Sequence, residues 1–162
     1  MNIGVIVIFH NNAEELNPQA VIETINATDK IKMCFVDNES KDDTLEHLLE
    51  IKESCGDKVS IVQIKKKVNC ESAKRAGARY MFNNFDLKHI GFMDTTDITE
   101  NNYDINEMLN ALCENKDDII AFDKTNKSKQ RIKTTFFKSI FSLLDYFSSL
   151  ETKHRIKVQS LF

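Results

Sequence analysis

The chain has 162 residues, of which 41% are hydrophobic and 29% charged, and its net charge at pH 7 is −3. These values predict one globular domain and exclude a low-complexity or membrane-spanning chain, and the weak negative charge gives no support for nucleic-acid binding. The four cysteines show no CxxC spacing, so we expect reduced, mostly buried thiols in a cytoplasmic protein.

Short apolar runs alternate with amphipathic patterns along most of the chain. Most of these runs are continuously hydrophobic, which is typical of parallel strands covered on both faces. Strands are predicted over residues 3–9, 31–37, 58–64, 88–94 and 118–123. Helices are predicted over residues 17–28, 40–54, 70–84 and 104–115. The alternation predicts an α/β fold with three layers, in which helices cover both faces of a mostly parallel sheet.

The starts of two predicted helices carry local signals. Asn17 followed by Pro18 predicts an N-cap with proline at the first helical position. Ser40 and Asp43 have capping-box spacing, with aspartate in place of the usual glutamate or glutamine.

The pattern changes from residue 124 onward. Residues 124–133 are basic and without periodicity, which predicts a mobile loop. Residues 134–150 place aromatic and aliphatic side chains at helical spacing. This helix either packs on the sheet or lies at a membrane interface. Residues 154–162 are compatible with a last strand.

The stretch GFMDTTDI, residues 91–98, contains two aspartates after an apolar run. Asp94 and Asp97 would repel each other unless a cation shared them, and carboxylates suit Mg²⁺ or Mn²⁺. A metal site, a damaged metal site and an ordinary strand-end turn all remain open at this point. Asp37 also ends a predicted strand, so we expect an acidic crevice where the strands end. No zinc-binding or nucleophile motif and no glycine-rich phosphate loop is present.

Two strand ends carry motifs that resemble those of family 2 glycosyltransferases, which have the GT-A fold. In VIVIFHNNAEEL, Asn11 and Asn12 match the family pattern and His10 stands where tyrosine is usual. The stretch FVDNESKDDTLEHL is similar to the signature Val-Asp-Asn/Asp-x-Ser-x-Asp-x-Thr. Residues in register with that signature are Val36, Asp37, Asn38, Ser40, Asp43 and Thr44.

The resemblance extends to the next two segments. NCESAKRAGARYM is similar to the helix before the family's metal motif, with Lys74 and Arg75 where Arg-Asn is common. GFMDTTDI resembles the Asp-x-Asp motif itself, but Thr96 replaces the second aspartate. The motif is therefore degenerate, and metal affinity should fall unless Asp97 acts as a ligand.

The resemblance implies a role for several residues. Asp37 would bind the nucleoside, supported by the backbone around Phe9, although an Asx turn that caps the next helix is the structural alternative. Lys74 or Arg75 would neutralise donor phosphate, unless they are solvated helix charges. The residues implied in nucleotide-sugar binding are Phe9, Asn11, Asp37, Asn38, Lys74 and Asp94. The implied ligands of Mg²⁺ or Mn²⁺ are Asp94 and Asp97.

By the same resemblance, the protein would transfer a sugar from a nucleotide diphosphate sugar to a glycan or polyprenol-phosphate acceptor, as in polysaccharide biosynthesis. The transfer would be inverting and metal-assisted. It requires a general base, but no residue matches one, and Asp123 and Asp145 are the nearby downstream aspartates. The alternative is a catalytically inactive nucleotide-binding module that acts as a partner or regulator. A receiver-like signalling domain is a third option.

The chain divides into two parts on this interpretation. Residues 1–123 would form the nucleotide-sugar-binding domain. Residues 124–162 would belong to the same domain or be a remnant of the acceptor region. Contact with a membrane through residues 131–150 would place the protein peripherally on the inner face of the cell membrane.

Overall fold

The computed structural model describes residues 2–128 and 139–160, with side chains up to residue 151. Its strands are β1 (Ile3–Phe9), β2 (Ile31–Asn38), β3 (Val59–Ile64), β4 (His89–Asp94) and β5 (Phe141–Ser142). Its helices are α1 (Pro18–Asn26), α2 (Thr44–Cys55), α3 (Cys70–Asn84), α4 (Thr95–Glu100), α5 (Ile105–Glu114), α6 (Lys116–Ser128) and α7 (Leu143–Ser160), with a 3-10 turn η1 (Gly56–Lys58).

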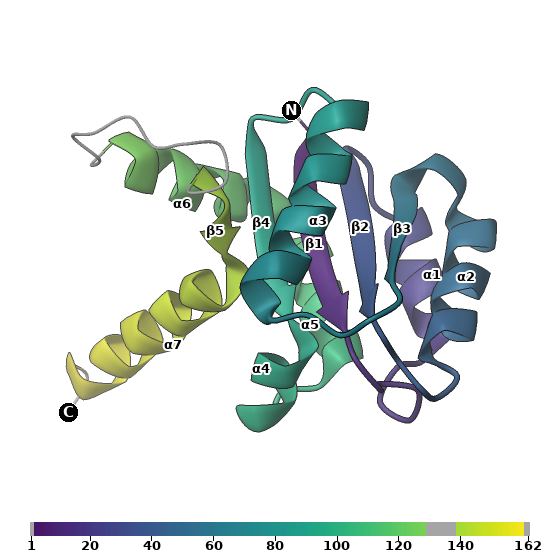
Figure 1. The fold of residues 1–162 in the computed structure, drawn as a ribbon. Coiled ribbons are helices and arrows are strands. Elements are labelled where there is room, and N and C mark those ends of the chain that lie inside the picture. The colour runs from purple at the N-terminus through teal and green to yellow at the C-terminus, as the bar shows by residue number, and fades with distance from the viewer. Residues whose placement is uncertain (1, 129–138, 161–162) are drawn as a thin grey trace.

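The five strands form one sheet in the order β3-β2-β1-β4-β5, and every pairing is parallel. Helices lie on both faces of this sheet (Figure 1). The predicted α/β fold is therefore confirmed. The chain moves outward from β1 in both directions, to β2 on one side and to β4 on the other. In such sheets the ligand crevice lies where the strand order reverses, at the carboxyl ends of β1 and β4.

The prediction of a fifth strand at residues 118–123 is wrong. These residues lie in α6, where Ile119, Ile120 and Asp123 form its buried face. The apolar run is short and has an aspartate at each end, and burial at positions i, i+1 and i+4 follows helical periodicity. The edge position is filled instead by β5, which pairs with Gly91 and Phe92 of β4.

Alternate residues of each central strand face two different apolar clusters. Val5, Val7 and Phe9 contribute to a large cluster with residues of α1, α2, α5, α6 and α7. Ile6 and Ile8 contribute to a smaller cluster with residues of α3. Both faces of β1 are therefore covered, which explains its continuously apolar sequence.

Helix α3 packs closely on the sheet through a face of small residues. Ala73, Gly77 and Ala78 are buried. A Cβ atom at Gly77 would meet Cγ2 of Ile6 at 2.8 Å and Cγ2 of Val36 at 3.0 Å. Glycine is needed at this position because the helix lies too close to β1 and β2 for a methyl group.

Local helix-start predictions had different outcomes. Asn17 is the N-cap of α1, because its side chain accepts from the Ala20 N–H. The prediction of a capping box formed by Ser40 and Asp43 is wrong. Helix α2 begins at Thr44, and the Asp43 side chain makes no capping hydrogen bond. The Oγ atom of Ser40 instead accepts from the loop after β1.

The C-terminal part differs from its prediction. The expected strand at residues 154–162 is wrong, because α7 continues to Ser160. Of the amphipathic helix expected at residues 134–150, residues 143–150 lie in α7, residues 141–142 form β5, and residues 134–138 lie outside the described residues. Residues 124–128 of the predicted loop belong to α6, and residues 129–133 lie outside the described residues. Within the described part of the chain, every helix is too short or too polar to cross a membrane.

The cysteines are free thiols. Cys34, Cys55 and Cys113 are buried as expected, whereas Cys70 is exposed at the start of α3.

Candidate functional site

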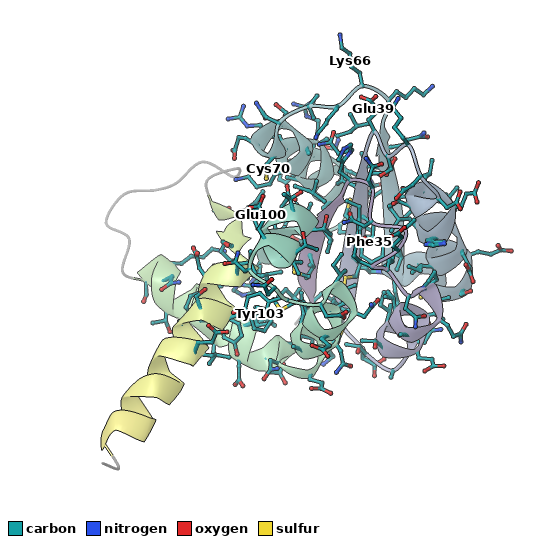
Figure 2. The ribbon with its side chains drawn as sticks, turned by 90° about the horizontal axis from the view of Figure 1, so that it is seen from below. Phe35, Glu39, Lys66, Cys70, Glu100 and Tyr103 are labelled. Carbon is teal, nitrogen blue, oxygen red and sulfur yellow. The ribbon has the colours of Figure 1, made fainter. Side chains whose placement is uncertain are left out.

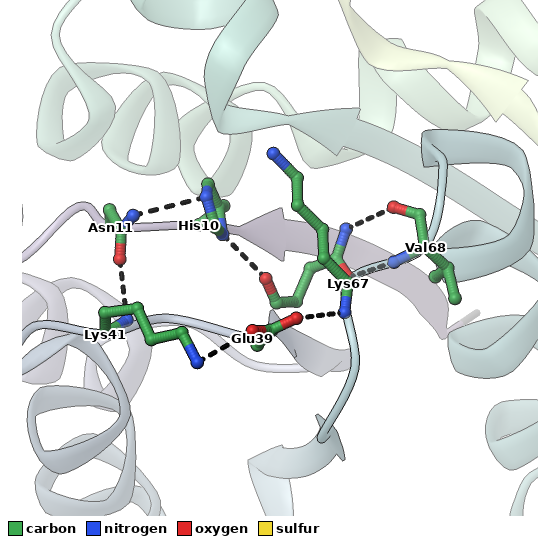
Figure 3. A network of polar contacts seen from close by, with 7 residues as sticks. His10, Asn11, Glu39, Lys41, Lys67 and Val68 are labelled. Atoms are coloured by element: carbon green, nitrogen blue, oxygen red, sulfur yellow. Dashed lines mark hydrogen bonds and ion pairs between the residues drawn. The ribbon is translucent and has the colours of Figure 1, made fainter.

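The loop after β1 is tied to the loop after β2 by hydrogen bonds. The Asn11 N–H donates to Oγ of Ser40 at 3.0 Å, and Oδ1 of Asn11 accepts from the Lys41 N–H at 2.7 Å. Nδ1 of His10 lies 2.7 Å from the carbonyl oxygen of Asn38. Figure 3 shows the contacts of His10, Asn11 and Lys41 in one network. The φ of Asn11 is 52°, a left-handed conformation that asparagine tolerates. The two loops are thus fixed against each other.

Asn12 connects three parts of the strand-end edge and is itself buried. Its N–H donates to Oγ1 of Thr44 at 2.7 Å, at the start of α2. Its Oδ1 accepts from the His10 N–H and from Oγ1 of Thr95, each at 2.8 Å. Sequence reasoning matched Asn12 to the family pattern but assigned it no site role. Its structural role is to join the ends of β1 and β4 and the start of α2.

Asn38 holds the loop between β3 and α3. Its Oδ1 accepts from the Val68 N–H at 3.1 Å, and its Nδ2 donates to the Val68 carbonyl oxygen at 2.8 Å (Figure 3). Glu39 stands beside it, 2.7 Å from Nζ of Lys41 and bonded to the Lys67 N–H. The Lys41 side chain, and next the Lys67 amide, hold the pKa of Glu39 below its usual range.

Asp37 is only 2% exposed, and its Oδ1 is buried with no hydrogen-bond partner among the described residues. The alternation of side chains along β2 places Asp37 on the same sheet face as Phe35, under α1 and α2. Val36 and Asn38 occupy the opposite face, under α3. Asp37 does not cap the next helix, whose N-cap is Asp43. The Asx-turn alternative is therefore not observed.

Phe9 ends β1 with its side chain in the core. The ring is fully buried and packs edge-on against Phe35, with 5.3 Å between ring centroids. Its backbone pairs with Asp37 in the sheet register. Of Phe9, only the backbone faces the strand-end edge.

Asp94 ends β4, directly across from Ile8 of β1. Its Oδ1 accepts from the Thr96 N–H at 2.8 Å, so Asp94 is the N-cap of the short helix α4. The strand-end turn that the sequence left open is therefore present. It uses one carboxylate oxygen of Asp94 and places the exposed Thr96 in the first turn of α4.

The carboxylate of Asp97 and the thiol of Cys70 both interact with Asp94. Figure 2 views this edge from the carboxyl ends of the strands and labels Cys70. Partial burial, and next the charges of Asp94 and Glu100, raise the pKa of Asp97. Partial burial and a hydrogen bond with Asp94 raise the pKa of the Cys70 thiol to about 12. The contact between Cys70 and Asp94 could not be predicted from the sequence, because Cys70 lies in a different element, α3.

Lys74 lies on the side of α3 that faces β4. Its side chain is 12% exposed, and its Nζ lies 2.9 Å from a Glu71 carboxylate oxygen and 4.6 Å from the centroid of the Phe92 ring. It is therefore not a freely solvated helix charge. Arg75 is more exposed, with its Nε 3.7 Å from Glu71.

The residues at the end of β4 fit a divalent ion in one respect. Among residues 2–128 and 139–151, no three metal-ligating side chains converge. Mg²⁺ is commonly held by only one or two carboxylates, with substrate phosphates and water completing its shell. Asp94 and Asp97 provide such a pair, and the negative charge of Asp94 contributes, after partial burial, to the raised pKa of Asp97.

Asp123 lies away from this edge. Its Oδ2 is 2.6 Å from Nδ1 of His89, the first residue of β4, and 2.8 Å from Nζ of Lys127. This buried group therefore anchors α6 at the amino end of β4. The carboxyl ends, where Asp94 lies, are at the opposite end of the strand.

The fold and the edge define an α/β domain of the kind that binds ligands where its parallel strands end. The model of the family described as "Glycosyl transferase family 2" matches residues 4–159. The chain therefore belongs to glycosyltransferase family 2. No curated protein sequence matches it.

Solved structures with partial similarity come from two organisms, Pyrobaculum calidifontis and S. aureus. The mannosyltransferase PcManGT from Pyrobaculum calidifontis, in complex with GDP-Man and Mn²⁺, is 21% identical with a TM-score of 0.42, over 49% of this chain and 24% of that chain. S. aureus TarS is 14% identical, with a TM-score of 0.44, and the match covers 59% of this chain and 16% of that chain. The TarS fragment 1-349 is 14% identical, with a TM-score of 0.45, and the match covers 62% of this chain and 31% of that chain. The matched part is thus less than a third of each solved chain.

Proposed function

We propose that this chain binds a nucleotide diphosphate sugar at the carboxyl ends of β1, β2 and β4 and takes part in transferring the sugar to a glycan or polyprenol-phosphate acceptor. Family membership supports glycosyl transfer. The location of the site is supported by one observation: the Oδ1 atom of Asp37 is buried and has no hydrogen-bond partner in the described part of the chain. A buried carboxylate oxygen without a partner is costly, and a ligand N–H or hydroxyl would remove that cost.

On this proposal, the nucleoside lies near the ends of β1 and β2. Asp37 accepts a hydrogen bond from the base or ribose, and the Phe9 backbone supports the base. Asn38 and Asn11 shape the same edge, since they fix the neighbouring loops. Lys74 extends from α3 and contributes positive charge toward the diphosphate. Its ammonium group would then interact with both the diphosphate and the Glu71 carboxylate.

Asp94 and Asp97 would hold Mg²⁺ or Mn²⁺ together with the donor diphosphate. When bound, such an ion screens the diphosphate and stabilises the departing nucleotide. The residues of this chain would orient the diphosphate against the end of β4, and Asp94 is fixed for this by its bond to the Thr96 N–H. The proposed transfer is inverting, and no residue is assigned as its base.

The proposal is tested by calorimetry with UDP, GDP and dTDP, each with and without Mn²⁺. We expect one nucleotide to bind, more tightly with Mn²⁺, and the Asp94→Asn/Asp97→Asn double variant to lose only the Mn²⁺-dependent increment. Asp86→Asn/Asp57→Asn, at exposed positions away from this edge, is the matched control and should bind as the unaltered protein does. Failure of all three nucleotides to bind would rule out the donor site.

A catalytically inactive nucleotide-binding module is the second candidate. It is favoured by Thr96, which stands where a second acidic ligand is expected. Metal-independent binding, combined with no turnover of the donor sugar, would support it over the enzyme. Hydrolysis or transfer of the sugar in the presence of Mn²⁺ would support the enzyme.

We also propose that the protein is cytoplasmic and contacts a membrane peripherally. The segment named for that contact, residues 131–150, lies partly outside the described residues. In the described part, Leu150 of α7 is 40% exposed.

A further inference from the structure

Positive charge is concentrated in two segments of this acidic chain, residues 124–133 and residues 65–84, and the structure describes all of the second. The segment from residue 65 to residue 84 contains six basic residues and one acidic residue, whereas the whole chain carries a net charge of −3. It comprises the loop after β3 and the whole of α3. The charges therefore gather on one side of the domain.

The packing of α3 sends most of these side chains outward. Its small residues pack on the sheet, and its outer side presents Arg75, Arg79 and Phe82 at helical spacing. Phe82 is 63% exposed, the most exposed large apolar side chain in the described part of the chain. We call Lys65, Lys66, Lys67, Arg75, Arg79 and Phe82 the basic face.

The basic face has few acidic partners of its own. Glu71 is its one acidic residue on α3 and already interacts with Lys74 and Arg75. In the described residues, no ion pair involves Lys65, Lys66 or Arg79. Figure 2 shows Lys66 reaching away from the domain into solvent.

We propose that the basic face binds the surface of an anionic lipid bilayer. Lysine and arginine side chains are attracted to anionic headgroups, and an exposed aromatic ring can enter the interfacial layer. The helical stripe suits a planar surface better than a small anion, because its charges are spread along α3 and the preceding loop. This contact goes beyond the proposed sugar transfer, and it involves a different segment from residues 131–150.

The proposal is tested with the full chain and vesicles of phosphatidylcholine, with or without phosphatidylglycerol, by co-sedimentation. We expect binding only to the anionic vesicles, and we expect high salt to weaken it because the charges are screened. Lys65→Gln/Lys66→Gln should weaken binding by about thirtyfold. Lys30→Gln/Lys124→Gln removes the same charge from exposed positions outside the basic face and should have little effect.

Phe82→Ser tests the aromatic contribution, and Leu49→Ser is its control. Leu49 is 49% exposed on α2, which packs on the other face of the sheet. We expect Phe82→Ser alone to reduce the binding that persists at high salt. Equal loss in both lysine double variants, or equal binding to neutral vesicles, would overturn the proposal.

Binding to soluble polyphosphate without binding to anionic vesicles would also overturn it, in favour of a polymeric anion. The vesicle measurement requires no nucleotide. Its failure therefore leaves the proposed donor site untouched, and failure of nucleotide binding leaves the lipid contact untouched.

Discussion

At the scale of single residues, two neighbours at the end of β2 have opposite environments. Asp37 lies under α1 and α2 with a buried oxygen that lacks a partner in the described residues. Asn38 lies under α3 with both ends of its amide bonded to Val68. A folded protein tolerates the first arrangement at a cost, which is a common feature of binding sites. We therefore expect a substitution of Asp37, rather than of Asn38, to raise the stability of the ligand-free protein while it weakens ligand binding.

Asp37→Asn is predicted to change stability and binding in opposite directions. Replacing the buried carboxylate by an uncharged amide lowers the cost of burial, so we expect the ligand-free protein to gain about 1 kcal/mol, or roughly 3 °C in melting temperature. Nucleotide affinity should fall at least about tenfold, since a hydrogen bond to a charged group is lost. Thermal unfolding and calorimetry measure the two effects. Lower stability with unchanged affinity would show that Asp37 is structural.

At the scale of elements, α3 combines two demands that its sequence meets on different sides. Its small residues allow close packing on β1 and β2, and its outer side carries the charges of the basic face. Its first turn brings Cys70 to Asp94, and the next turn brings Lys74 over Phe92. The position of α3 therefore affects the candidate donor site as well as the core.

Gly77→Ala is predicted to destabilise the protein, although alanine favours helices by about 1 kcal/mol over glycine. The added methyl group would overlap Ile6 and Val36, which are fully buried and β-branched. Overpacking of this kind costs about 1–3 kcal/mol, so we expect a net loss of about 1 kcal/mol. Denaturant unfolding measures it. Ser72→Ala, at an exposed position of the same helix, should change stability by less than ~0.5 kcal/mol; a stabilised Gly77→Ala variant would contradict the close packing.

At the scale of the whole molecule, the C-terminal elements share the main core. Leu143 and Tyr146 of α7 belong to the same apolar cluster as Val5 and Val7 of β1. Leu143 is fully buried and lies over Gly91 of β4. This packing supports treating the described part of residues 124–162 as part of one domain, which stays a prediction until unfolding is measured.

Leu143→Ala is predicted to lower the stability of the whole domain. Removing a buried leucine side chain costs about 2–5 kcal/mol. Because the core is shared, we expect far-UV circular dichroism to show a single transition at a lower temperature. Leu150→Ala, at a 40% exposed position of α7, should have a small effect. A separate, early transition confined to part of the helical signal would show instead that the C-terminal elements unfold independently.

The sequence is sufficient to predict the first four strands, the helices between them, the α1 cap at Asn17 and the resemblance to the family. Apolar runs, helical periodicity and caps are local, so they are readable without the fold. It also placed Asp37 and Asp94 at strand ends, because those positions follow directly from where the apolar runs stop.

Features that depend on contacts between distant segments are set by the tertiary structure. It turned residues 118–123 into part of α6, since β5 takes the place beside β4. It joined Asn12 to Thr95, 83 positions away, and it placed Asp37 under α1 and α2 but Asn38 under α3. Burial and polar pairing are set by which segments become neighbours in space, and the sequence pattern of one segment does not contain that information.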